Sequence, residues 1–160
     1  MIYNDNIREI KADPYNRLRK RNIRNTQCGE FNCGGFALGT IIWYLPIPKR
    51  NMYIERGYRD EVDNKKLINK YTQYMLKEFP DLRVIKDIKE LQADEYAIAF
   101  RLAKDWDDDF HFLKRGKNGV WYQKVGGRWG ITVVPKKEVF SDFWNERYSG
   151  IIVLFAKKFA

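Results

Sequence analysis

Residues 96–125 read YAIAFRLAKDWDDDFHFLKRGKNGVWYQKV, and this stretch decides the fold class. Runs of apolar and aromatic residues at Tyr96–Ala103, Asp109–Arg115 and Val120–Val125 each have the length and composition of a β-strand. Gly116-Lys117-Asn118-Gly119 has the composition of a turn, so the second and third runs are expected to form a hairpin. Downstream, the pattern predicts two more strands and, between them, one short helix: Ile131–Val134, Ile151–Phe155 and Lys137–Trp144.

Upstream of these strands the sequence predicts helices. Apolar residues recur at helical spacing from Asn32, a good N-cap, to Leu45, and prolines follow. A second amphipathic helix is expected from Asp60 to Glu78, with residues 46–59 as the loop before it and a helical turn at 87–91 after it. Helices followed by a largely antiparallel sheet indicate an α+β domain.

Length and composition favour one folded domain over residues 1–160. Hydrophobic residues make up 44% of the chain and aromatic residues 16%, which is typical of a globular protein and not of a disordered one. We divide the chain into a basic lead-in (1–25), a helical part (26–78) and a sheet part (79–160).

The chain is strongly basic, with 30 Lys+Arg against 21 Asp+Glu and a net charge of +9 at pH 7. Such a charge favours acidic partners, either an acidic protein or nucleic acid, although a solvated basic face is the simpler interpretation. No motif of a known nucleic-acid-binding fold is present. The candidate contact residues cluster in the lead-in, which also has a short helical pattern: Arg17, Arg19, Lys20, Arg21 and Arg24.

The sequence carries no sign of a membrane or of export. No window approaches the ~18 apolar residues of a membrane span, and the N-terminus lacks the pattern of a secretory signal. We therefore expect a cytoplasmic protein, whose two cysteines are reduced thiols.

Cys33 is the residue that points most directly to chemistry. It lies where a loop becomes an apolar helix, and a thiol at a helix N-terminus has a lowered pKa, so Cys33 is expected to react faster than Cys28. The Cys33 N–H and the side-chain amide of Gln27 could stabilise an oxyanion. The alternative is that Cys33 is a small buried hydrophobe and that Gly34 and Gly35 permit close packing or close approach of a substrate.

His111, the only histidine, is the candidate base for such a thiol. Gln123, on the next strand, could orient the imidazole if the hairpin has the right register, and we predict that the hairpin 109–125 places His111 and Gln123 on the face toward Cys33. A three-residue loop, Lys117-Asn118-Gly119, with the glycine in the left-handed region, places both side chains on one face of the sheet, whereas loops of two or four residues separate them. The alternative roles are structural: a hydrogen bond for His111, and a polar interior partner of Trp121 or Tyr122 for Gln123.

These residues resemble the papain-like cysteine hydrolase superfamily, particularly its short bacterial peptidases and cell-wall amidases. The amino-acid sequences of Asn32–Thr40 and Asp109–Phe112 also resemble those of uncharacterised proteins of Gram-positive bacteria and their phages. The resemblance implies a papain-like fold with N-terminal helices on a mostly antiparallel sheet. It also implies the roles of oxyanion donor, nucleophile, base and orienting residue for Gln27, Cys33, His111 and Gln123. Gly34 departs from the pattern, which has a bulky residue after the nucleophile, and glutamine is unusual at the third position.

Neither a metal nor a cofactor is expected. Cys28, Cys33 and His111 could supply three zinc ligands, but the paired spacing and the fourth ligand of a zinc site are missing. The acidic run 105–109 is interpreted as a solvated loop that would raise the pKa of the neighbouring His111.

The sequence thus predicts a cysteine hydrolase that cleaves an amide or isopeptide bond of a peptide or protein through a thiolate–imidazole pair. The alternative is a non-catalytic binding or inhibitor protein on the same scaffold, with a basic face for an acidic partner. The distance between the Cys33 sulfur and the His111 ring discriminates between the two.

Overall fold

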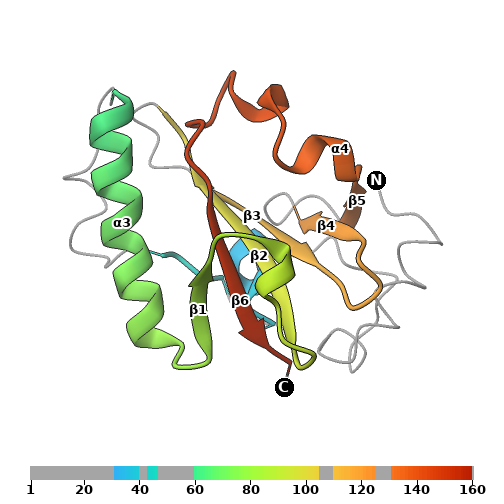
Figure 1. Ribbon diagram of the computed structural model, residues 1–160. Helices are drawn as coiled ribbons and strands as arrows, with labels where there is room; N and C mark the ends of the chain where they lie inside the picture. The colour runs from blue at the N-terminus through green and yellow to red at the C-terminus, as the bar shows by residue number, and fades with distance from the viewer. Residues whose placement is uncertain (1–30, 40–42, 47–59, 105–109, 125–130, 160) are drawn as a thin grey trace.

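The computed structural model describes residues 31–39, 43–46, 60–104, 110–124 and 131–159 (Figure 1). Its centre is one six-stranded sheet in the order β1-β6-β2-β3-β4-β5, and all neighbouring strands are antiparallel. The strands are β1 (Leu82–Ile85), β2 (Glu95–Leu102), β3 (Phe110–Arg115), β4 (Trp121–Lys124), β5 (Ile131–Val134) and β6 (Val153–Lys158). Helices with a mostly antiparallel sheet make this an α+β fold, as the sequence predicted.

The helices are short except for one. They are α2 (Cys33–Ala37), α3 (Glu61–Glu78) and α4 (Lys136–Val139), with 3-10 turns η3 (Ile88–Glu90) and η4 (Asp142–Trp144). The helix predicted from Asp60 is confirmed as α3: the Asp60 side chain accepts a hydrogen bond from Asp63 N at 2.8 Å, which caps the first turn. None of the described helices is long and apolar enough to cross a membrane.

The helix expected from Asn32 to Leu45 is much shorter in the structure. It ends at Ala37, and Gly39 adopts a φ of 71°, a left-handed conformation that stops a helix and that glycine adopts without strain. Residues 43–46 are not helical, so apolar spacing alone overestimated the length of this helix.

Three other differences concern the sheet part. β1 was not predicted, and it is a four-residue edge strand. The last strand begins at Val153 and continues to Lys158, two residues later than expected at its start. The helix expected over 137–144 is instead α4 followed by η4, and the Ser141 side chain caps the second turn by accepting from Phe143 N.

The two faces of the sheet bury separate cores. One face, called the α2 face here, packs against α2 and α3 and includes Ile98, Phe100 and Phe112. The other, called the α4 face, packs against α4 and the segment around Trp144 and includes Ala99 and Leu113. Successive side chains of β2 and β3 therefore alternate between the two cores, as the period of a strand requires.

Candidate functional site

Cys33 begins α2 and is buried on the α2 face. Asn32 is the N-cap, as expected: its Oδ1 accepts from Gly35 N at 2.9 Å and from Tyr44 N at 3.0 Å, and its Nδ2 donates to Tyr44 O at 2.8 Å. The Cys33 thiol is reduced and the residue is only 6% exposed. The helix start is thus held to the Tyr44 segment by an asparagine that is itself buried.

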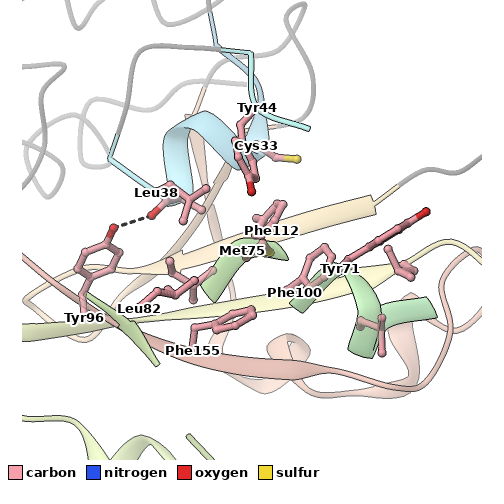
Figure 2. Packing of buried hydrophobic residues seen from close by; sticks show 14 of the residues in the cluster. Cys33, Leu38, Tyr44, Tyr71, Met75, Leu82, Tyr96, Phe100, Phe112 and Phe155 are labelled. Carbon is pink, nitrogen blue, oxygen red and sulfur yellow. Dashed lines mark hydrogen bonds between the residues drawn. The ribbon is translucent and has the colours of Figure 1, made fainter. Parts of the chain in front are cut away.

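Gly34 is explained by packing. A Cβ at this position would lie 3.1 Å from Tyr44 Cδ2 and 3.3 Å from Phe112 Cε2, tighter than most real contacts. A neighbouring side chain therefore occupies the space beside the nucleophile candidate, which was one of the two possibilities for the glycine pair. Figure 2 shows Cys33 on its short helix, on the same side of the sheet as Phe100 and Phe112.

The hairpin has the register that joins His111 and Gln123. Gly116 N donates to Val120 O at 2.8 Å, which leaves Lys117-Asn118-Gly119 as a three-residue loop, and Gly119 has a φ of 85°. His111 Nε2 lies 2.8 Å from Gln123 Oε1. Because the amide oxygen can only accept, Nε2 carries the proton in this pair and Nδ1 has the lone pair. The prediction that these two side chains share a face is confirmed.

The expectation that this face is directed toward Cys33 is wrong. Phe112 packs beside Cys33 in the core of the α2 face, whereas Leu113 belongs to the core of the α4 face. His111 has the same parity along β3 as Leu113, and its ring contacts Trp144, which packs against that second core. The sheet therefore lies between the Cys33 thiol and the His111 imidazole, and the structure does not form the predicted thiol–imidazole pair.

On the α4 face, His111 is enclosed by aromatic rings and by a cation. Its ring centroid lies 5.6 Å from that of Trp144 and 6.0 Å from that of Tyr148, and Arg101 is its partner across β2 and β3. Burial, together with the nearby Arg101 and Arg147, lowers the pKa of His111 to about 4, and the Gln123 hydrogen bond only partly opposes them. The expected rise in the His111 pKa is therefore wrong; the acidic run 105–109 lies outside the described residues.

Arg101 is the residue of this cluster that the sequence analysis missed. It is 1% exposed, its Nη2 donates to Val139 O at 2.7 Å, and its guanidinium lies 4.6 Å from the Trp144 ring centre. Its Nη1 is buried and has no hydrogen-bond partner. Burial lowers the pKa of Arg101 to about 10, so it is still charged at neutral pH. An arginine inside an otherwise apolar strand was the available signal.

Several candidates lie outside the described residues: Gln27, Cys28 and the basic residues Arg17, Arg19, Lys20, Arg21 and Arg24. In the described part of the chain, no group of three or more His, Cys, Asp or Glu side chains could hold a metal ion. The described residues thus offer two separate features: a buried thiol on one face, and a buried Arg101–His111–Gln123 cluster on the other. A comparison with family models, with curated proteins and with solved structures found no match for this chain.

Proposed function

We propose that this chain is a non-catalytic binding protein for an acidic protein partner. The observation that carries the proposal is the position of Cys33 and His111 on opposite faces of the sheet. A thiol needs a base within hydrogen-bond reach to become an efficient nucleophile, and loop closure does not bring two groups together through a sheet. The hydrolase hypothesis therefore loses its base, and the alternative drawn from the sequence becomes the better supported one.

The state of His111 supports the same proposal. An imidazole whose pKa is about 4 is neutral at pH 7, and its protonated nitrogen is already held by Gln123. It cannot stabilise a thiolate as an imidazolium, which is what the predicted mechanism required. The papain-like resemblance, and the cytoplasmic location expected with it, stay predictions.

The net charge of +9 favours an acidic partner. The test uses poly-L-glutamate as the model acidic chain, with binding measured by fluorescence anisotropy at two salt concentrations. Reversal of Arg17 and Arg21 to Glu is expected to weaken binding strongly at low salt and little at high salt, because ions screen such attraction beyond about 10 Å at 0.1 M. The control reverses Lys65 and Lys66, two exposed lysines of α3; equal loss in both variants would refute a contact localised in the lead-in.

A second measurement tests the hydrolase directly. An acyl-electrophile probe and a general alkylator are compared on the wild type, Cys33→Ala and His111→Ala. We expect His111→Ala to leave the labelling rate of Cys33 nearly unchanged. Rapid acylation of Cys33 that both substitutions abolish would overturn the proposal and restore the hydrolase. Tighter binding of a DNA duplex than of poly-L-glutamate would instead replace the acidic protein with nucleic acid as the partner.

A further inference from the structure

A pocket of about 530 Å³ lies at the end of the sheet where β1 ends and β6 begins. Most of its lining is apolar, with Ile85, Ile88, Phe140, Ile152 and Leu154 among the contributing residues, and its two charged lining residues are Lys86 and Asp87. This volume is in the range of small-molecule sites, which combine an apolar lining with a few polar groups. Phe140, at the wall of the pocket, is 51% exposed, and its ring packs edge-on against that of the core residue Trp121.

Arg101, whose Nη1 has no hydrogen-bond partner, is not itself a lining residue of this pocket but is close in the structure to two residues that are. β2 and β6 pair Phe100 with Val153, so Arg101 and Ile152 are the next residues along the same antiparallel register and share the α4 face. On the other side, Arg101 donates to the carbonyl of Val139, the residue before Phe140. Ile152 and Phe140, which line the pocket, therefore lie between it and the Arg101 side chain.

Within the described residues, Arg101 is a buried cation without a carboxylate partner: none of the salt bridges there includes it. Its neighbour His111 is neutral at pH 7, and Arg101 and Arg147 both lower the pKa of His111. A buried, unpaired charge is unfavourable, because the interior does not replace its hydration. Tyr148 and Trp144 offset the unfavourable burial of this charge only through the dipole of the tyrosine and the cation–π contact with the tryptophan ring. The arrangement is electrostatically complementary to an anion.

We propose that this pocket binds an aliphatic carboxylic acid, with its hydrocarbon chain against the apolar lining and its carboxylate on Arg101 Nη1. Because Arg101 is not a lining residue, Phe140 must shift so that the carboxylate reaches Nη1. An aliphatic chain fits better than a peptide terminus, because the backbone amides of a peptide would have few polar partners among the lining residues. Charge-assisted hydrogen bonds between arginine and carboxylate are among the strong ones in proteins. The proposal goes beyond binding of an acidic protein and does not depend on it.

The test measures binding of octanoate by calorimetry and its effect on thermal unfolding. Arg101→Met keeps an unbranched apolar stem and removes the guanidinium with its charge. Lys158→Met is the control, because Lys158 is exposed and lies at the opposite end of β6. We expect octanoate to bind the wild type and Lys158→Met alike and to bind Arg101→Met at least about tenfold more weakly. 1-Octanol, which lacks the carboxylate, should bind weakly and equally to all three.

Measurements of the stability of the variant and of the His111 signals make the result of the octanoate experiment interpretable. Without ligand, Arg101→Met should be at least as stable as the wild type, because it removes an unpaired buried charge. If Arg101→Met does not fold, Arg101→Lys replaces it. A second readout is the NMR spectrum of the ring of His111, the single histidine, whose signals octanoate should shift in the wild type. Undetectable octanoate binding, equal binding by Arg101→Met, tighter binding of 1-octanol, or preference for N-acetyl-leucine would each overturn the proposal. Poly-L-glutamate binding should be the same in Arg101→Met, so a failure here is separable from a failure of the proposed function.

Discussion

The buried state of His111 makes the stability of this protein dependent on pH in a defined window. In the folded protein the pKa of His111 is about 4, against an ordinary value of 6.5 that applies to the unfolded chain. Between these two values the unfolded state binds a proton that the folded state does not, so acid favours unfolding. The contribution of His111 is fully present above pH 6.5 and is lost as the pH falls from 6.5 to 4.

The size of the effect follows from the difference between the two pKa values. A difference of about 2.5 corresponds to about 3 kcal/mol of unfolding free energy, at about 1.4 kcal/mol per pH unit. The assay is urea unfolding followed by tryptophan fluorescence at intervals from pH 7 to pH 4. Because His111 is the only histidine, a two-dimensional NMR titration of its ring reads the folded pKa without ambiguity.

The control for this prediction is His111→Gln, a neutral residue that does not titrate. It should be less stable at pH 7, because ring packing against Trp144 and Tyr148 is lost, but its stability should change much less between pH 6.5 and pH 4. Carboxylates also contribute to acid unfolding, but the pKa of Glu95, lowered by its hydrogen bonds with Arg83, acts at lower pH. A His111 pKa at or above 6.5, or equal pH dependence in wild type and variant, would refute a buried neutral imidazole.

Three further predictions concern other parts of the structure. Gly119→Ala should destabilise the protein by about 1 kcal/mol in the same urea unfolding assay, because its φ of 85° disfavours a side chain. Gly150→Ala should be nearly neutral, because an added Cβ would lie at an ordinary contact distance of 3.9 Å from Asn145 Oδ1; equal effects would contradict the hairpin register. Glu95→Gln should lower the unfolding free energy by about 2 kcal/mol, because Arg83 holds this buried carboxylate with two bonds of 2.9 and 2.7 Å. Asp94→Asn is its control: this exposed group lies 3.8 Å from Lys158 and should change stability by less than about 0.5 kcal/mol. Because Cys33 is buried, it should react with iodoacetamide at least about tenfold faster in denaturing urea than in the native protein, as measured by mass spectrometry. Fast labelling of the native protein would refute the burial of its thiol.

Much of this fold could be predicted from local sequence patterns. The turn Gly116–Gly119, together with alternating residues on both sides of it, determined the register of the hairpin and hence the pairing of His111 with Gln123. Both features depend on the backbone conformation of a few neighbouring residues. The capping side chains of Asn32 and Asp60 are local in the same sense.

The tertiary structure decided which face of the sheet meets which helix. Alternation along β3 shows that His111 and Phe112 point to opposite sides, but it does not say on which side α2 packs. That choice depends on long-range contacts such as Phe112 against the Gly34 backbone, which no spacing in the sequence encodes. It separates Cys33 from His111 and brings Arg101, Trp144 and His111 together, because a residue's neighbours across a sheet are set by the packing of the whole chain.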